Sequence, residues 1–172
     1  MYAVNYLPLI DSSKSTTGCC TLIEPSEWDK QTFEFDNKLF AKAQTRSIMH
    51  IPLNMSSVMR KAQQAIDDVD AAEKEWIILS KEVSPWKAEH YFAVTRDVPV
   101  LDMEHLSGTF MTKVFEGPFK NAGEWYEQLV EFVKDAGKTP VQTYFFYTTC
   151  PNCSKTYGKN YVVGFAQVAQ EK

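Results

Sequence analysis

The sequence has no excess of positive charge and none of the common signatures of nucleotide, metal or serine chemistry. Its 172 residues contain 18 Lys and Arg against 22 Asp and Glu, a net charge of -4. Such a chain lacks the basic face that a nucleic-acid backbone requires, so we expect no direct contact with nucleic acid. The patterns GxxxxGK[ST], GxGxxG, HExxH and GxSxG are all absent. Function therefore has to be inferred from the order of elements and from local clusters of residues.

Long hydrophobic runs are missing too. No stretch approaches the ~18 apolar residues of a membrane helix. The first residues also lack the basic start and the long apolar core of a secretory signal. We therefore expect a cytoplasmic protein without membrane contact, and we expect its four cysteines to be reduced.

Aromatic residues, in contrast, are abundant. The chain contains 11 Phe, 8 Tyr and 4 Trp, and 44% of its residues are hydrophobic. A chain of this length can bury a sizeable core. The aromatic side chains can serve that core, a stacking pocket for a ligand, or both.

The order of elements repeats along the chain. Amphipathic helices are predicted near 55–71 and 121–136, and Pro52/Pro118 and Pro85/Pro151 have the same offset (118 − 52 = 151 − 85 = 66). The pattern predicts an α+β fold of two βαββ repeats with pseudo-twofold symmetry, an antiparallel sheet and both helices on one face. The predicted organisation is a partly irregular extension (1–37) followed by one domain (38–172), with repeats at 38–99 and 100–172.

Several motifs carry a family resemblance. The run Lys113 to Phe119 with its Gly117-Pro118 turn, followed by a Trp- and Tyr-bearing helix, resembles the GyrI-like effector-binding family. The resemblance implies a groove between the repeats that binds a small, mostly apolar or aromatic molecule. The runs 147–153 and 157–161 resemble a stand-alone bacterial subgroup labelled hydrolases, which implies the alternative of a small-molecule hydrolase using the same groove. No protein partner is indicated.

Five aromatic residues are candidates for the walls of such a groove: Trp86, Phe119, Trp125, Tyr147 and Tyr161. For Trp125, Tyr147 and Tyr161, packing between the helices and the sheet is the alternative. The family often carries a Glu on the closing strand, where this chain has Val163. This difference argues against strong selectivity for cationic ligands.

Two ionisable residues occupy matching positions in the two repeats, His50 and Glu116, each two residues before its proline. Brought together near a symmetry axis, they could activate water as a base. The alternative is that both lie at solvated strand ends. Glu82 and Glu89, on either side of Pro85, are further carboxylates that could serve a hydrolase.

The motif Cys150-Pro-Asn-Cys153 allows three interpretations. The two thiols could shape a turn, provide half of a tetrahedral zinc site, or perform redox chemistry. The motif is predicted to lie in a loop, because residues 154–160 do not show a helical pattern. We expect no cofactor. Zinc at Cys150/Cys153 is the one metal that the sequence leaves open, in a zinc- or redox-linked interaction module, and it would need Cys19, Cys20, a histidine or a neighbouring subunit to complete its ligands.

Overall fold

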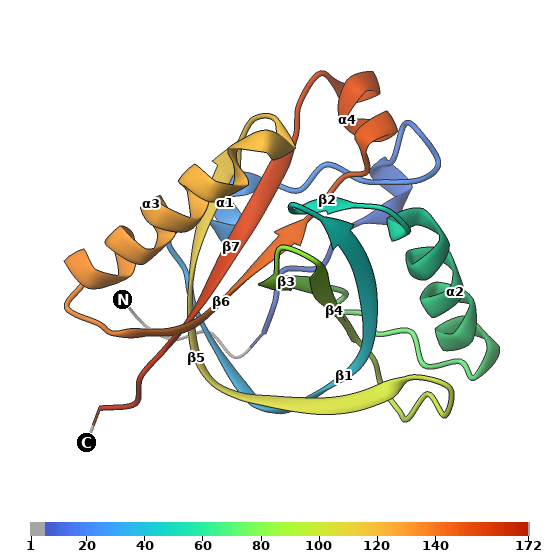
Figure 1. Ribbon diagram of the computed structural model, residues 1–172, viewed down its shortest axis with the longest axis horizontal. Helices are drawn as coiled ribbons and strands as arrows, with labels where there is room; N and C mark the ends of the chain where they lie inside the picture. Colours follow the sequence, from blue (N-terminus) through green and yellow to red (C-terminus); the bar gives the residue numbers. More distant parts are fainter. Residues whose placement is uncertain (1–5, 172) are drawn as a thin grey trace. The chain divides into compact units, whose positions relative to one another are not determined.

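The computed structural model describes residues 6–171 and confirms the predicted α+β class with an antiparallel sheet (Figure 1). The chain divides into two compact units. Unit 1 contains the residues up to Phe35 together with those from Gly108 onward, and unit 2 contains Asp36–Ser107. Within each unit a strand, a helix and two further strands follow one another, with a two-residue strand in addition in unit 2 and a short helix before the last strand of unit 1.

Unit 2 has antiparallel strands with one helix packed on them. The strands follow the order β2-β1-β4-β3. Helix α2 contributes Ala62 and Ile66 to a core that includes Ala41 and Phe92 from the strands. The bounds are β1 (Thr32–Ile48, which enters unit 2 at Asp36), β2 (Ile51–Pro52), α2 (Met55–Asp68), β3 (Ile78–Ser84) and β4 (Lys87–Ala93).

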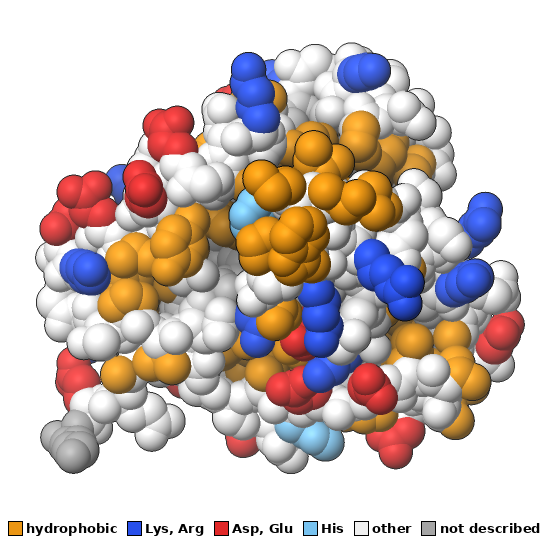
Figure 2. Space-filling model, in the orientation of Figure 1, with side chains coloured by type: hydrophobic (Ala, Val, Ile, Leu, Met, Phe, Trp, Pro, Cys, Tyr) orange, Lys and Arg blue, Asp and Glu red, His pale blue; other side chains and the backbone are white. Residues whose placement is uncertain are grey.

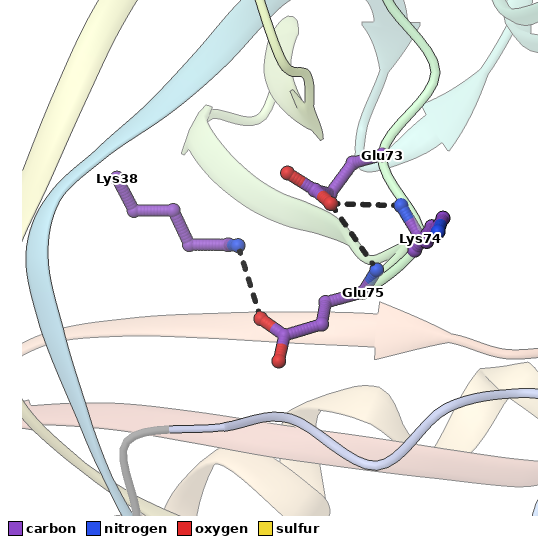
Figure 3. Close-up of polar contacts among 4 residues, drawn as sticks. All are labelled: Lys38, Glu73, Lys74 and Glu75. Carbon is purple, nitrogen blue, oxygen red and sulfur yellow. Dashed lines mark hydrogen bonds and ion pairs between the residues drawn. The ribbon is translucent and has the colours of Figure 1, made fainter.

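The entry to β3 is fixed by side chains from the same unit. The Glu73 carboxylate accepts hydrogen bonds from the backbone N–H groups of Lys74 (2.8 Å) and Glu75 (3.4 Å), as Figure 3 shows. Lys38 of β1 lies 3.9 Å from the Glu75 carboxylate. The Lys38 and Glu75 side chains are partly buried, at 16% and 27% exposure, so the ion pair adds to the backbone contacts of Glu73 at this turn.

Unit 1 has the strand order β6-β7-β5, again antiparallel, with helix α3 on one face. Trp125, Leu129 and Val133 of α3 pack with Val162 of β7. A Cβ atom at Gly164 would lie 2.8 Å from a Leu129 methyl, so glycine allows the helix to approach closely. The bounds are β5 (Asp102–Glu116), η2 (Phe119–Asn121), α3 (Ala122–Asp135), β6 (Pro140–Tyr147), α4 (Pro151–Tyr157) and β7 (Tyr161–Val168).

The opposite sheet face of unit 1 is covered by the N-terminal segment, which contains η1 (Ser12–Lys14) and α1 (Pro25–Trp28). Trp28 is 1% exposed, and its ring centroid lies 5.7 Å from that of Phe146 and 6.3 Å from that of Phe165. The Thr112 hydroxyl of β5 donates to the Trp28 carbonyl. The sequence left this face open to a cover or a cleft, and in unit 1 it is covered.

No helix within residues 6–171 is long and apolar enough to cross a membrane.

Candidate functional site

A pocket of about 620 Å³ lies at the end of β1 in unit 2. Its lining combines an indole and a leucine side chain with two cations, Arg46 and Lys87, and none of the described residues that line it is a carboxylate. This composition suits a small apolar molecule that carries a negative group. The lining residues are Gln44, Thr45, Arg46, Ser47, Leu53, Asn54, Trp86 and Lys87.

Exposed hydrophobic side chains surround this pocket. Figure 2 shows such side chains gathered over β2 and the β3–β4 turn, with Lys and Arg side chains beside them. Trp86 is 57% exposed, and the other large exposed hydrophobic residues of these segments are Ile48, Met49, Ile51, Leu53 and Val83. Two backbone hydrogen bonds hold the hairpin to the end of β1, from Ser47 N–H to the Trp86 carbonyl (2.8 Å) and from His50 N–H to the Pro85 carbonyl (2.9 Å). Trp86 therefore sits on a fixed backbone, and its role as a ligand wall stays a prediction.

A charged cluster lies next to the pocket, on the sheet face opposite α2. The Glu89 carboxylate accepts a hydrogen bond from the Tyr91 hydroxyl (2.8 Å) and lies 3.5 Å from the Lys42 ammonium group, which is also 3.3 Å from Glu104. Glu89 is paired directly with Gln44 across the strands, and directly opposed residues share a face. The cluster and the pocket are thus continuous along β1.

The charged forms of Glu89 and Lys42 are favoured in this cluster. Burial favours the neutral form of Glu89, but the Tyr91 hydroxyl and the charges of Lys42 and Lys81 outweigh it and hold the pKa of Glu89 below its usual value. Burial likewise acts against the charge of Lys42, and Glu104 and Glu89 nevertheless raise the pKa of Lys42. Glu89 is therefore a carboxylate at neutral pH, with a fixed hydrogen-bond donor beside it.

His50 and Glu116, the predicted catalytic pair, lie in different units. Within unit 2, His50 Nδ1 lies 2.8 Å from Glu82 Oε2, and both side chains are more than half exposed. His50 also has a positive φ of 70°, in the tight turn between β1 and β2. The described contacts of His50 are those of a turn at a strand end, which was the alternative interpretation of the sequence.

The predicted aromatic residues of unit 1 fall into two groups. Trp125 is 4% exposed and stacks on Phe115 at 5.7 Å between ring centroids, so it belongs to the core under α3. Phe119 and Tyr147 lie 5.8 Å apart and are only partly buried. Tyr161, the first residue of β7, is also partly buried. Phe119, Tyr147 and Tyr161 remain candidates for contact with a ligand.

A second polar centre, in unit 1, consists of thiols. The Sγ atoms of Cys19, Cys20, Cys150 and Cys153 all lie within 4.8 Å of one another. The prediction of a loop at 154–160 is wrong, because α4 covers Pro151–Tyr157. Pro151 occupies the first turn, where its missing N–H costs nothing, and Gly158 ends the helix at a φ of 68°.

Hydrogen bonds organise the sulfur atoms. The backbone N–H of Cys150 donates to Cys20 Sγ, and that of Cys153 donates to Cys150 Sγ, both at 3.4 Å. Thr17 Oγ1 lies 3.3 Å from Cys153 Sγ, and this contact lowers the pKa of the Cys153 thiol to about 7. Burial raises the pKa of the Cys20 thiol. The cluster thus combines one thiol that ionises easily with one that does not.

Comparison with models of known protein families identifies the family of this chain. The model of the family described as Bacterial hydrolase matches residues 10–168. The chain belongs to this family. The comparison with curated proteins found no match.

Solved structures share the fold at low sequence identity. An uncharacterized conserved protein from Listeria innocua has 8% identity and a TM-score of 0.57, covering 83% of this chain and 93% of its own. A hydrolase encoded by lin2189 from Listeria innocua has 9% identity and a TM-score of 0.57, covering 83% and 92%. SAV2435 bound to tetraphenylphosphonium has 12% identity, coverage of 82% and 94%, and a TM-score of 0.48, which is too low to support a conclusion about this chain.

Proposed function

We propose that this protein binds a small aromatic or apolar molecule with a negative group in the pocket of unit 2. The observation that carries the proposal is the lining itself, in which Trp86 and Leu53 offer apolar surface beside Arg46 and Lys87. Arg46 and Lys87 are direct partners across β1 and β4, so their side chains lie on the same face. The GyrI-like resemblance of the sequence supports a ligand-binding role, and the absence of a carboxylate in the lining agrees with weak preference for cations.

A dye titration tests this proposal. The anionic aromatic dye 1-anilinonaphthalene-8-sulfonate is expected to bind the folded protein with micromolar affinity, about -8 kcal/mol, and the cationic dye rhodamine 6G is expected to bind more weakly. Trp86→Ala and Arg46→Gln should each weaken binding of the anionic dye by roughly 1–3 kcal/mol, the range expected for an aromatic or charge-assisted contact.

Two control sets locate the site. Val100→Ala, at a smaller pocket of about 310 Å³ beside α2, should leave the affinity unchanged. Tyr147→Ala and Tyr161→Ala test the aromatic side chains of unit 1. Loss of binding in these two variants, with none in Trp86→Ala or Arg46→Gln, would move the site to unit 1.

Hydrolysis of the bound molecule is the second candidate, favoured by family membership and by the carboxylate of Glu89 next to the pocket. In this reaction a water oxygen forms a bond to an electrophilic carbon of the ligand while Glu89 takes a proton from that water. The bond between this carbon and the leaving atom then breaks, the leaving atom takes a proton from solvent, and Glu89 returns its proton to solvent. Tyr91 and Lys42 hold the carboxylate in place. Because its pKa is lowered, Glu89 stays ionised well into the acid range, so activity should persist below neutral pH.

A substitution separates binding from turnover. Glu89→Gln keeps the shape of the side chain and removes its capacity to accept a proton, so turnover of small aromatic esters should fall by about 10²–10⁴-fold with little change in dye affinity. Glu82→Gln is the matched control, because Glu82 is an exposed carboxylate that contacts His50, and this variant should keep the wild-type rate. Equal rates in wild type and Glu89→Gln would exclude Glu89 as the base.

A further inference from the structure

We propose that Cys19, Cys20, Cys150 and Cys153 form a structural zinc site with four thiolate ligands. All four Sγ atoms lie within 4.8 Å of one another, and those of Cys19 and Cys20 are 3.6 Å apart. Around a tetrahedral zinc with bonds of about 2.3 Å, sulfur atoms lie roughly 3.8 Å apart. The cluster therefore needs only a small contraction to reach the geometry of a zinc site.

The surroundings of the sulfur atoms are those of a ligand set. Thiolates that bind a metal are stabilised by hydrogen bonds from outside the coordination sphere. Here the N–H groups of Cys150 and Cys153 donate to Cys20 Sγ and Cys150 Sγ. The Thr17 hydroxyl contacts Cys153 Sγ, and it also accepts hydrogen bonds from the N–H groups of Cys19 (3.2 Å) and Cys20 (3.3 Å). One threonine thus orders both halves of the cluster.

The chemistry of the donors selects the metal and its role. Four sulfur ligands without carboxylate or imidazole favour a soft ion, of which zinc is the ordinary choice in a tetrahedral site. Four protein ligands leave no open position for water or substrate, so the site is structural rather than catalytic. This inference is independent of the pocket and of the charged cluster in unit 2.

The site would fasten the N-terminal segment to α4. Cys19 and Cys20 precede Cys150 by about 130 residues, and a clip that closes so long a loop removes much freedom from the unfolded chain. Without metal, the described links at this point are hydrogen bonds, such as those from the Tyr157 hydroxyl to the Cys20 carbonyl and from Thr16 N–H to the Tyr157 hydroxyl (3.3 Å). Zinc would hold the segment that leads to the buried Trp28.

The test measures metal in the full chain purified under reducing conditions. We expect about one zinc ion per wild-type chain. At the same concentration of free zinc, the variants Cys20→Ser and Cys153→Ser should each hold at least tenfold less zinc than the wild type. Thr17→Val should weaken zinc affinity by about 10–100-fold, as loss of an outer hydrogen bond does. Asn152→Ala, an exposed position between two of the ligands, is the matched control and should keep its zinc.

A second measurement does not depend on the folding of the cysteine variants. Wild type loaded with cobalt should show the sulfur-to-metal charge-transfer bands and the strong red d–d bands of tetrahedral thiolate coordination. Removal of zinc by a chelator should expose the segment before Trp28 to protease and leave four free thiols on alkylation. Less than a tenth of a zinc per chain with no cobalt spectrum, bound iron in place of zinc, or a disulfide among these cysteines in the protein as purified would each overturn the proposal.

Discussion

The two units share an order of elements but differ on the sheet face that points away from their helix. On the closing strand, the third and fifth residues point to that face in both units. They are Glu89 and Tyr91 in β4 of unit 2, and Val163 and Phe165 in β7 of unit 1. Unit 2 thus carries a hydrogen-bonded carboxylate where unit 1 carries a fully buried valine. In unit 2 the polar cluster lies beside the buried Phe40, Leu79 and Tyr91, whereas in unit 1 the corresponding positions are part of an aromatic core.

In unit 1 this face is covered by the N-terminal segment. In unit 1, Trp28 packs on Phe165, and Thr112 of β5 donates its hydroxyl to the Trp28 carbonyl. At the position in β1 that corresponds to Thr112, unit 2 has Lys42, which pairs with Glu89. A face covered by an indole has to be apolar, because an unpaired buried charge is costly. The proposed reaction is therefore expected on this face of unit 2, and the thiol cluster lies in unit 1.

The largest loss of stability is expected when a carboxylate, as at Glu89 of unit 2, is placed at the corresponding Val163 of unit 1. Val163→Glu should destabilise the protein by about 4–6 kcal/mol at neutral pH, because Val163 is fully buried and a carboxylate at this position would lose its hydration. The loss should shrink toward pH 4, where the carboxyl is neutral in the unfolded chain as well. Chemical denaturation over pH measures it. Val141→Glu, 61% exposed in β6, is the control, and equal stability of the two variants would contradict a closed face.

Removing the cover of unit 1 should have the next largest effect. Trp28→Ala deletes a buried indole that contacts three phenylalanines, so a loss of about 3–5 kcal/mol in the free energy of unfolding is expected. Trp86→Ala, in the exposed hairpin of unit 2, should change stability by no more than about 0.5 kcal/mol. Urea titration of both variants makes the comparison. A Trp28→Ala protein as stable as Trp86→Ala would show that the segment does not support the fold.

The two units also differ at the fourth residue of the closing strand, and this difference should make stability depend on pH. It is Gly164 in unit 1 and the buried His90 in unit 2, whose ring nitrogens contact Thr45 Oγ1 (2.9 Å) and Ser80 Oγ (2.7 Å). Burial lowers the pKa of His90 to about 4. The unfolded chain therefore binds more protons between pH 6.5 and 4, so stability is full above pH 6.5 and falls as the pH drops toward 4.

The size of this effect follows from the same shift. A fall in the pKa of His90 from 6.5 to about 4 corresponds to a change of about 3 kcal/mol in the free energy of unfolding. His90→Gln should be less stable than wild type at pH 7 and should lose about 3 kcal/mol less between pH 6.5 and 4. Identical slopes in wild type and His90→Gln would mean that His90 is not buried in its neutral form.

The fold could be predicted from the sequence because its signals are local and repeated. The helical spacing from Met55 predicts α2 to within three residues, and the stripe around Leu129 predicts α3 to within one. Helix α4 was missed because it is only seven residues long and mostly polar. Its signal was present in the Cys150-Pro151 start and in Gly158, which fit a short helix with a glycine end.

The candidate sites were harder to predict because long-range packing creates them. The sequence pointed to Cys150/Cys153, but adjacent residues such as Cys19-Cys20 do not resemble the second half of a metal site. Only folding of the N-terminal segment onto unit 1 brings all four thiols together. Glu89 was one of several carboxylates near Pro85, and nothing local separates it from Glu82. The difference arises from Lys42, 47 positions earlier (89 − 42), which reaches Glu89 through the pairing of β1 with β4.

The smallest change in stability is expected when Glu89 of unit 2 is replaced by valine, the residue at the corresponding position of unit 1. This variant also separates structural from functional roles most clearly. Glu89→Val removes a partly buried carboxylate together with its contacts to Tyr91 and Lys42, while Lys42 keeps Glu104 as a partner. The free energy of unfolding should therefore fall by only about 1–2 kcal/mol, the range expected for one hydrogen bond to a charged group. Binding of the anionic dye should be unchanged or tighter, since a negative charge next to the pocket is gone, while any hydrolysis that depends on Glu89 is lost. Isothermal dye titration and urea unfolding of this variant, beside Glu82→Val, provide the measurement. A loss above 3 kcal/mol would show that Glu89 is retained for the fold, and the contrast between the two units would then be structural rather than functional.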